Sequence, residues 1–353
     1  MTLSNTPTAY AVSPDSGRHW TAEGAWQVAE GIHRIPLPLP MDGLKAVNVY
    51  VIETDDGLTM VDGGWAIEVA REVLERHLRA LGAGFGDIRR FLVTHVHRDH
   101  FTLAAMLGEE YGAEVMLGAD EKPSLDLIHD GDRSSRGGFS SALVSAGAGD
   151  LAARWNREGG PPDPATWRYP DTWLDGDHPI PVGTRTLEAV HTPGHTPGHY
   201  VFFDRSAELL FAGDHVLPTI TPSIGFTVPP APHPLGDFMA SLTKVRALPD
   251  VRVLPAHGPV APSSHARVDE LLGHHEQRLG QSLAALGDGP ATGFDVAQQL
   301  GWTRHQRPFE ELDVFNRGMA AMESKAHLEL LVTRGLATRT EMPDGTVEFT
   351  RIL

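Results

Sequence analysis

The chain has 353 residues, of which 41% are hydrophobic and 21% are charged, and its formal net charge is −17 at pH 7. This length predicts one large domain with a smaller one appended, and the composition is that of an ordinary globular protein. The acidic charge disfavours non-specific attraction to nucleic acid and to anionic membranes. Because the chain has no cysteine, disulfides, thiolate metal ligands and a cysteine nucleophile are excluded, which leaves His, Asp and Glu as strong metal ligands.

The beginning of the chain carries no targeting signal that the sequence reveals. It lacks the basic and apolar regions of a signal peptide, and no stretch approaches the ~18 apolar residues that a membrane span needs. We therefore expect a mobile N-terminus over residues 1–25 and a cytoplasmic protein without membrane contacts. The missing cysteines fit that compartment.

The first half of the chain alternates short apolar segments with turn residues. Val47–Glu53 and Leu58–Asp62 are predicted strands joined by the turn sequence TDDG, which indicates a hairpin. Apolar residues then recur at helical spacing across Ile67–Leu81, and Gly82 follows where a helix terminator is expected. The sequence RFLVTHVHRDH predicts a buried strand, Phe91–Thr94, that leads into a histidine-rich loop.

The alternation continues with a helix at Leu103–Tyr111, a strand at Glu114–Leu117 and a helix at about Asp120–His129. The regular pattern then stops, because residues 130–177 are rich in Gly, Ser, Pro and Trp. A stretch of this length with little periodicity is typical of a functional lid or of a disordered segment. We expect a partly ordered flap over the functional site.

Strands return in the second half, at Thr184–His191, His199–Asp204 and Leu209–Asp214, and the last two are joined by the turn sequence DRSAE. A helix is predicted over PLGDFMASLTKVRALP, and VRVLPAHG then predicts a strand that leads into another histidine loop. The chain thus holds two successive blocks of strands and helices, each with His and Asp in the loops after its strands. We expect two similar halves of one α/β sandwich.

Helical patterns dominate the end of the chain. A long amphipathic run covers Ala266–Leu286, and the rest predicts a helix, a long helix and a β-hairpin in that order. This order describes a winged-helix module, so we expect a catalytic domain at 26–262 and a C-terminal domain at 263–353. Residues 290–353 hold seven Lys or Arg against nine Asp or Glu, whereas a module that reads nucleic acid is normally basic. We interpret it as a dimerisation or lid element.

Histidine and aspartate gather at four points that follow predicted strands. The candidate metal ligands are His95, His97, Asp99, His100, His195, Asp214 and His257. Because side chains alternate along an extended segment, His95 and His97 point the same way and can hold one ion, while Asp99 and His100 can face a second. Imidazole and carboxylate ligands suit Zn²⁺, Mn²⁺ or Fe, and an isolated Asp such as Asp214 can bridge two ions.

The series HVHRDH, GHTPGH, AGDH and PAHG, in that order and with these separations, resembles the metallo-β-lactamase superfamily over about residues 26–262. The resemblance implies an αββα sandwich of two related halves, and the tail resembles the branch with a C-terminal winged helix. It also implies a ligand set. His95, His97 and His195 would hold a first metal ion, Asp99, His100 and His257 a second, and Asp214 would bridge them.

Other residues near the motifs have less specific assignments. Asp62, in MVDGG, resembles a residue that orients the ligands without binding metal, with the capping of a turn as the alternative. Thr102 stands where family members often have Gly, and its side chain could narrow the loop or touch the substrate. His215 is a candidate substrate contact, with a surface or ligand-supporting position as the alternative. Trp167 and Trp173 could line an apolar acyl or aromatic pocket, or pack locally.

Histidines outside the ligand set receive ordinary roles. His199, which ends the motif GHTPGH, is expected at the surface or beside a ligand, as are His191 and His233. His274 and His275 lie on a predicted helix, and we expect both to be solvated.

The ligand set predicts hydrolytic chemistry. Two divalent ions, most simply Zn²⁺, lower the pKa of bound water from about 15.7 toward ~7 and so supply hydroxide at neutral pH. An ion also polarises a carbonyl and stabilises the oxyanion, and Asp99 could carry a proton to the leaving group. The resemblance therefore implies a dinuclear hydrolase.

The substrate is less constrained, because superfamily members act on β-lactams, lactones, thioesters, and RNA or other phosphodiesters. The acidic charge, the Trp-bearing flap and the non-basic tail favour an ester, thioester or lactone of a small molecule. A homodimer through the C-terminal domain is the expected assembly. The alternatives are a ribonuclease or phosphodiesterase and a mononuclear iron oxygenase on the same sandwich. The presence of Asp99, His100 and His257 weighs against the oxygenase.

Overall fold

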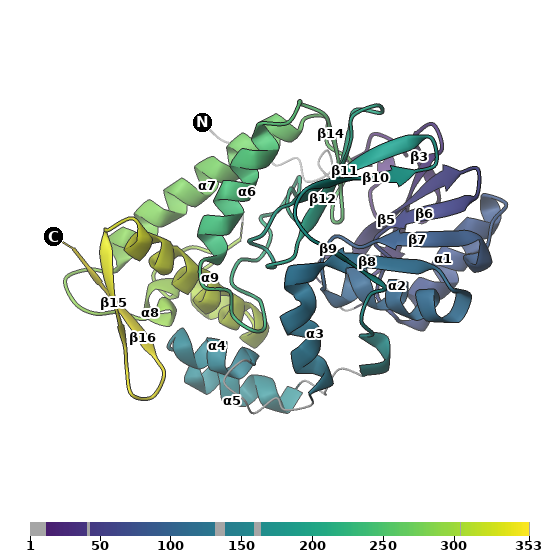
Figure 1. Cartoon of the computed structure of the whole chain (residues 1–353). Coiled ribbons are helices and arrows are strands. Elements are labelled where there is room, and N and C mark those ends of the chain that lie inside the picture. Colours follow the sequence, from purple (N-terminus) through teal and green to yellow (C-terminus); the bar gives the residue numbers. More distant parts are fainter. Residues whose placement is uncertain (1–11, 41–42, 131–137, 159–163, 304, 353) are drawn as a thin grey trace.

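Two β-sheets lie face to face, with helices outside them (Figure 1). The computed structural model describes residues 12–40, 43–130, 138–158, 164–303 and 305–352. The first sheet has the strands β3 (Trp26–Ala29), β4 (Ile32–Pro38), β5 (Ala46–Thr54), β6 (Gly57–Val61), β7 (Ile88–Leu92), β8 (Glu114–Gly118) and β9 (Thr172–Leu174), in that spatial order. The second has β10 (His178–Val182), β11 (Arg185–His191), β12 (Tyr200–Asp204), β13 (Leu209–Gly213) and β14 (Arg252–Pro255).

The space between the sheets is filled by apolar side chains from both. Tyr50 and Leu92 of the first sheet belong to one core cluster with Phe202 and Phe211 of the second. The central strands are buried on both faces, which explains why their sequences are nearly continuous apolar runs rather than alternating ones. This packing fixes one sheet against the other.

Helices cover the outer face of each sheet. Helices α1 (Glu68–Ala80) and α2 (Arg98–Tyr111) pack on the first sheet through a core that includes Leu74 and Phe101. Helices α6 (Pro234–Arg246) and α7 (Ser264–Ala285) pack on the second through a core that includes Phe238. The layers are therefore helix, sheet, sheet and helix, so the expected αββα sandwich is confirmed.

The histidine-rich segment differs from its predicted form. The helix expected at Leu103–Tyr111 begins five residues earlier, at Arg98, and is preceded directly by His97. Asp99 and His100 therefore lie in the first turn of α2, where a carboxylate interacts favourably with the positive end of the helix dipole. The apolar pattern does not reveal this turn, because its first three residues are polar or charged.

The N-terminal residues that the structure describes are held against the sandwich. Residues 12–25, which the sequence predicts to be mobile, include the short antiparallel pair β1 (Val12–Ser13) and β2 (Arg18–His19). Asp15 lies 2.8 Å from the fully buried guanidinium of Arg34 on β4. This ion pair ties the segment down. Residues 1–11 lie outside the described residues.

The region expected to form a flap contains regular structure where it is described. Helix α3 (Lys122–His129) precedes it, and α4 (Phe139–Ser145), α5 (Gly149–Glu158) and β9 lie within it. The α4 and α5 residues Leu143 and Leu151 pack in a small core with Ala321 and Met322 of the C-terminal region. Residues 131–137 and 159–163 lie outside the described residues. The role of the segment as a flap stays a prediction.

The C-terminal region contains α8 (Gly293–Ala297), α9 (Val314–Thr333), β15 (Ala337–Glu341) and β16 (Val347–Arg351), the helix, long helix and hairpin that the sequence predicts. Short 3-10 helices occur at Phe85–Asp87, Ala119–Glu121, Pro164–Thr166 and Phe309–Glu311. The core between the second sheet and α6 continues without a break into this region, because Val253 and Phe349 belong to one apolar cluster. The identity of the C-terminal region as a winged helix stays a prediction.

Among the described helices, none has the length and apolar character required to cross a membrane.

Candidate metal centre

Strand ends of the two sheets bring the candidate ligands together. Strands β6 and β7 are parallel neighbours and end just before Asp62 and His95, while β13 and β14 are parallel neighbours and end just before Asp214 and His257. The loop from β11 to β12 supplies His195. Hydrogen bonds join the sheets here. The backbone N–H of Tyr200 donates to the carbonyl of Thr94 at 2.8 Å, and that of Asn48 donates to the carbonyl of Ala256 at 2.7 Å.

A first group of ligand atoms comes from His95, His97, His195 and Asp214. The Nδ1 atom of His97 lies 3.0 Å from Nε2 of His95 and 3.1 Å from Nε2 of His195. An Asp214 oxygen, Oδ2, lies 3.4 Å from the same His195 nitrogen. Three imidazole nitrogens and one carboxylate oxygen thus converge on one point, which is a ligand set typical of zinc sites.

A second group comes from Asp99, His100 and His257. The Oδ2 atom of Asp99 lies 3.4 Å from Nε2 of His257 and 3.8 Å from Nε2 of His100. The other Asp214 oxygen, Oδ1, lies 3.3 Å from His257 and 3.7 Å from His100. Asp214 therefore directs one oxygen at each group.

The structure thus gathers all seven candidate ligands in one place. In the part of the chain that the structure describes, these two groups are the only clusters of three or more His, Asp or Glu side chains with metal-binding geometry. The side chain of Asp99 is 13% exposed, against 0% for His100 and 2% for His257. The centre therefore opens to solvent on the side of Asp99.

Each ligand histidine with an inward Nε2 atom has its other ring nitrogen occupied. The Nδ1 atom of His195 lies 2.8 Å from the carbonyl of Ser223, and that of His257 lies 2.8 Å from the carbonyl of Ala46. These contacts require the Nδ1–H tautomer, so Nε2 keeps a lone pair directed at the centre. The rings are oriented before any ion binds.

Asp62 orients His100 in the same way. Its Oδ2 atom lies 2.8 Å from Nδ1 of His100, and its Oδ1 atom accepts the backbone N–H of Thr94 at 2.8 Å. The Thr94 hydroxyl also lies 3.0 Å from Nδ1 of His95. Asp62 has φ of 60°, a left-handed conformation that few side chains other than Asn and Asp adopt readily. The geometry agrees with a supporting role for Asp62.

Burial keeps several of the histidines neutral. Burial, together with the neighbouring His195, lowers the pKa of His97 to about 3. Burial also lowers the pKa values of His95 and His195. Neutral imidazoles have free lone pairs and cannot repel a cation, which is the state that a metal site requires.

The opposite shift occurs at His100. Although burial opposes protonation, the carboxylates of Asp62, Asp99 and Asp214 raise the pKa of His100 to about 10. The pKa of Asp214 falls to about 2 because His257, His100 and His195 outweigh the effect of burial. The three carboxylates therefore favour positive charge at this point.

Unpartnered atoms show where a cation fits. Within the described residues, Nε2 of His100, Nε2 of His257 and Oδ1 of Asp214 are buried and have no hydrogen-bond partner. Such atoms cost free energy unless a ligand satisfies them. All three face the second group, so the donor set fits a divalent ion there as well as in the first group.

His199 supports Asp214, a role that motif reasoning left open. It is fully buried, its Nδ1 lies 3.0 Å from the Thr192 hydroxyl, and its Nε2 accepts the backbone N–H of Asp214 at 3.2 Å. Gly213 stands just before Asp214 with φ of 49°, and a Cβ there would lie 2.7 Å from Nε2 of His199. The second histidine of GHTPGH and the glycine of AGDH are therefore both needed to place Asp214.

Glu121 is a further buried residue that the sequence did not single out. It is 0% exposed, accepts a hydrogen bond from the Thr196 hydroxyl, and lies 3.4 Å from the backbone nitrogen of Val96. Burial raises its pKa to about 7. Glu121 connects the loop of His95 and His97 to the loop of His195. Its position in a predicted helix gave no signal of this.

Thr102 and His215, two tentative substrate contacts, are both buried. The Thr102 hydroxyl donates to the carbonyl of Arg98 at 2.6 Å and accepts the backbone N–H of Ala66 at 2.9 Å. It thus ties α2 to the loop after β6. His215 is 0% exposed, and its ring packs edge-on against Phe238 of α6 at 5.0 Å. Burial lowers the pKa of His215 to about 3.

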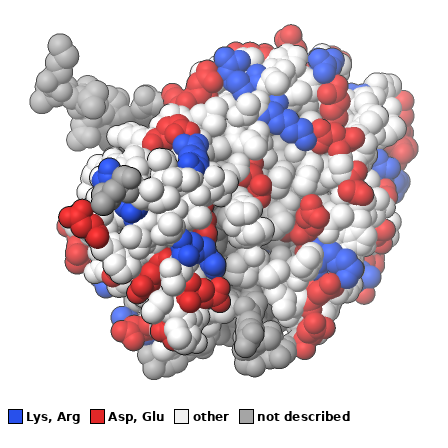
Figure 2. Space-filling model, turned by 60° about the vertical axis from the view of Figure 1, so that its left-hand side comes forward, with Lys and Arg blue, Asp and Glu red and all other residues white. Residues whose placement is uncertain are grey.

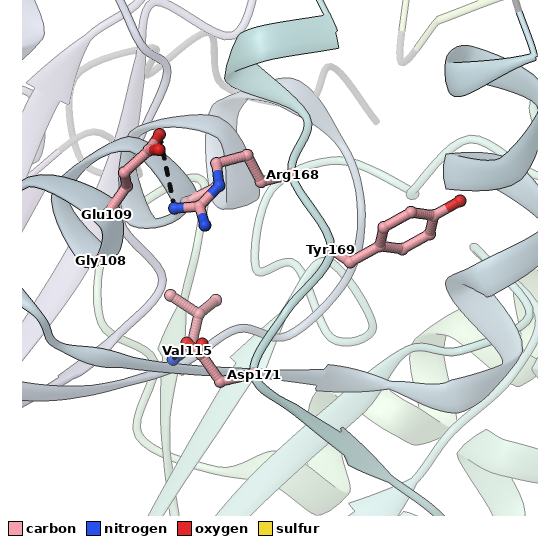
Figure 3. A pocket seen from close by; sticks show the side chains of 7 residues that line it. Gly108, Glu109, Val115, Arg168, Tyr169 and Asp171 are labelled. Atoms are coloured by element: carbon pink, nitrogen blue, oxygen red, sulfur yellow. Dashed lines mark hydrogen bonds and ion pairs between the residues drawn. The ribbon is translucent and has the colours of Figure 1, made fainter.

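Trp167 and Trp173, the other tentative pocket residues, pack against the core under α2. A cavity of about 190 Å³ lies nearby, and its lining includes Gly108, Glu109 and Arg168 (Figure 3). Inside it, Glu109 and Arg168 form an ion pair of 3.4 Å. Gly108 is ten residues along α2 from Arg98, or ~15 Å at 1.5 Å per residue. This cavity therefore lies apart from the metal centre.

A sandwich of this kind with a His and Asp centre at its strand ends defines a metal-dependent hydrolase. The family model "Metallo-beta-lactamase superfamily" matches residues 42–257, more than half of the chain. The protein belongs to the metallo-β-lactamase superfamily.

Similar proteins occur in bacteria and fungi. The Bacillus subtilis (strain 168) protein named "Probable metallo-hydrolase YqjP" is 24% identical over 76% of this chain and 83% of its own length. The "Lactamase-like protein vrtG" of Penicillium aethiopicum is 35% identical over 69% of this chain and 61% of its own length. The "Atrochrysone carboxyl ACP thioesterase AacuM" of Aspergillus aculeatus is 33% identical over 34% of this chain and 38% of its own length. For the two fungal proteins, the match thus spans less than two thirds of the relative.

Solved structures extend the similarity beyond the catalytic sandwich. A metallo-beta-lactamase family protein from Thermus thermophilus superposes with a TM-score of 0.76 at 28% identity, over 92% of this chain and all of that chain. A beta-lactamase domain protein from Burkholderia ambifaria gives a TM-score of 0.74 at 25% identity, over 96% of this chain and 97% of that chain. Such coverage includes the C-terminal region.

Proposed function

We propose that this hydrolase uses two divalent metal ions, most simply Zn²⁺, to cleave an ester, thioester or lactone carbonyl of a small molecule. The observation that carries the dinuclear state is the position of Asp214. Its Oδ2 faces His195 at 3.4 Å, and its Oδ1 faces His257 at 3.3 Å. A carboxylate shared in this way suits two ions held close together.

The chain's residues hold and orient the reacting groups. His95, His97 and His195 would hold one ion, and Asp99, His100 and His257 the other. When bound, such ions lower the pKa of a water ligand and polarise a carbonyl oxygen. The buried, pre-oriented imidazoles supply this environment without rearrangement, which is the condition for effective electrostatic stabilisation.

Asp99 is the group best placed to move a proton. It is the more exposed carboxylate of the centre, since its side chain is 13% exposed and that of Asp214 is 9% exposed. A carboxylate at the open side can accept a proton from water and return it to the leaving group. We therefore assign Asp99 two roles, as ligand and as proton carrier.

The surface charge favours a small substrate over a polynucleotide. Among the described residues on the face in Figure 2, Lys and Arg are interspersed with Asp and Glu and do not form a continuous patch. The net charge of −17 adds a general repulsion of phosphate backbones. The name of the fungal thioesterase supports a thioester as the first substrate to test.

The decisive experiment is a substrate screen on protein whose metal content has been quantified. Metal-loaded protein should hydrolyse small thioesters, esters or lactones and should leave single-stranded RNA intact. The His97→Ala variant should lose the activity. Cleavage of RNA alone, abolished in His97→Ala, would instead identify a ribonuclease, and one iron per chain with no hydrolysis would identify a mononuclear iron oxygenase.

A further inference from the structure

Three phenylalanine rings from separate segments meet beside the metal centre. Phe226 lies in the loop between β13 and α6, Phe139 begins α4, and Phe315 lies in the first turn of α9. The rings of Phe139 and Phe226 stack at 4.4 Å and 19°, and Phe315 meets Phe226 edge-on at 5.8 Å and 76°. We call these three residues the phenylalanine wall.

The phenylalanine wall adjoins a metal ligand. The ring centroids of Phe226 and His97 are 6.1 Å apart. The loop that carries Phe226 is also fixed to the centre, because the carbonyl of Ser223 lies 2.8 Å from Nδ1 of His195. A ligand histidine of the first group thus holds the loop three residues before Phe226.

The wall has the accessibility that a binding surface requires. His97 and Asp99 are partly exposed, whereas His95 and His100 are fully buried. Phe139 and Phe226 are partly buried, and Phe315 is 50% exposed. A molecule that approaches the exposed ligands therefore meets apolar surface.

The three segments enclose further apolar space. A small cavity of about 50 Å³ is lined by residues that include Ala142 of α4, Gly225 of the loop, and Met322 and Ala326 of α9. The same segments that carry the phenylalanine wall line this cavity. Lys325 and Glu329 of α9 also line it and form an ion pair of 3.2 Å, so the lining is largely but not wholly apolar.

We propose that the phenylalanine wall binds the apolar acyl part of the substrate and makes the enzyme selective for large apolar acyl groups over acetyl. The proposal rests on the proposed carbonyl hydrolysis. The bond broken is the carbonyl carbon to sulfur or oxygen bond, with water as co-reactant and a carboxylic acid and a thiol or alcohol as products. Phe315 makes the C-terminal region part of the substrate site.

Burial of apolar surface sets the expected size of the effect. Each methylene removed completely from water contributes roughly a fourfold gain in binding. A hexanoyl group, which is four methylenes longer than acetyl, should raise kcat/KM by at least ~tenfold even if burial is partial. Because this binding is present in both the ground state and the transition state, the gain should appear mainly in KM.

The test compares acetyl, butyryl, hexanoyl and benzoyl thioesters of N-acetylcysteamine. Wild-type protein should show the rise of ~tenfold or more in kcat/KM from acetyl to hexanoyl. Phe226→Ala should reduce that ratio to about threefold or less, and Phe315→Ala should reduce it partly. Leu336→Ala removes a 42% exposed apolar side chain from the turn after α9 and serves as the matched control, with an unchanged ratio.

A merely structural role for Phe226 predicts a different result. In that case kcat/KM would fall equally for the acetyl and hexanoyl substrates. The hexanoyl-to-acetyl ratio would then stay at the wild-type value. Metal content is measured for every variant, because loss of metal would also lower both rates. If Phe226→Ala does not fold, Phe226→Leu and Phe315→Ala still report the ratio.

A second measurement needs no turnover. Isothermal titration calorimetry with acetate, hexanoate and benzoate on metal-loaded protein should show tighter binding of the larger carboxylates, and Phe226→Leu should weaken that preference. Equal binding of all three, or hydrolysis that ignores acyl size, would overturn the phenylalanine wall and leave the hydrolase intact. Size-selective binding without any thioester, ester or lactone hydrolysis would overturn the proposed substrate class and leave the wall intact.

Discussion

Within the part of the chain that the structure describes, histidines are buried together in two regions, and only one of these has the convergent ligand atoms that hold a cation. In the metal centre, imidazole nitrogens and carboxylate oxygens converge in two groups. In the second region, His275 of α7 faces His327 of α9, with Nδ1 of His275 3.3 Å from Nε2 of His327. Both of these histidines are 1% exposed or less.

The difference lies in the charges and in the direction of the free nitrogens. The metal centre has the carboxylates of Asp62, Asp99 and Asp214, which favour positive charge. In the helix pair, His327 is held by the backbone carbonyl of Glu323 at 2.8 Å. Burial, together with the charge of Arg278, lowers the pKa of His327 to about 4. Buried histidines without convergent carboxylates thus form core packing, not a metal site.

The largest expected effect is the loss of the bridging carboxylate. Asp214→Asn keeps the shape of the side chain but removes the negative charge that faces both groups. On the proposed dinuclear centre, bound metal should fall from two ions per chain to one or fewer, measured by plasma mass spectrometry. Activity should fall by about a thousandfold or more, because several kcal/mol of charge stabilisation are lost.

The helix pair provides the contrast for that experiment. His275→Gln changes a buried histidine outside the centre and should leave two metal ions per chain, although it lowers the melting temperature. Loss of metal in His275→Gln, or full metal content and activity in Asp214→Asn, would remove the distinction between the two regions.

The second prediction concerns acid stability. His327 has a pKa of about 4 in the folded chain and an ordinary value of 6.5 when unfolded. Between those values the unfolded chain binds more protons, so stability is lost as the pH falls from 6.5 toward 4. On metal-free protein, His327→Gln should reduce this loss by up to about 3 kcal/mol in urea unfolding.

An exposed histidine is the control for this measurement. This control is the variant His129→Gln, because His129 lies on the surface and outside the helix pair. A His327→Gln curve that runs parallel to the wild type from pH 6.5 to 4 would show that His327 does not titrate on unfolding.

The sandwich and the convergence of the seven candidate ligands could be predicted from the sequence, because the signals for both lie within short segments. Strands buried on both faces appear as continuous apolar runs, and ligands on loops after those strands form short motifs. His95 and His97 at a spacing of two can be read directly. Asp62 is 38 positions from the His100 ring that it supports, and only the resemblance to a family indicated its role.

The residues that sequence reasoning missed depend on contacts between distant segments. His275 is expected to be solvated because it lies on a helix with charged neighbours, yet it is 0% exposed since α9 packs over it. Glu121 and His199 likewise support loops far along the chain. No periodicity within a single segment contains that information.

Asp62→Asn tests the support of the ligands rather than the ligands themselves. The change weakens the orientation of His100 and removes one of the charges that raise its pKa. Metal affinity should fall by about 10-fold to 100-fold, and excess metal should restore most activity. Titration against a competing chelator measures this. Asp204→Asn, which changes a buried carboxylate paired with Arg185 outside the centre, should leave metal affinity unchanged.

The smallest expected effect is that of Glu323 on the pH dependence of stability. Its sign is opposite to that of the effect of His327. Burial raises the pKa of Glu323 to about 6 from an ordinary value of 4.5. Between pH 4.5 and 6 the folded chain therefore binds more protons than the unfolded chain. The contribution of Glu323 to stability is full below pH 4.5 and is lost as the pH rises through 6. Because the side chain is partly exposed, solvent screening limits the effect to about 1 kcal/mol. The difference in free energy of unfolding between Glu323→Gln and wild type should favour the variant more at pH 7 than at pH 4.5. The metal content should be unchanged. A stability difference of the opposite sign between those two pH values would show that the carboxylate is stabilised as an anion in the helix pair, as Asp214 is in the metal centre.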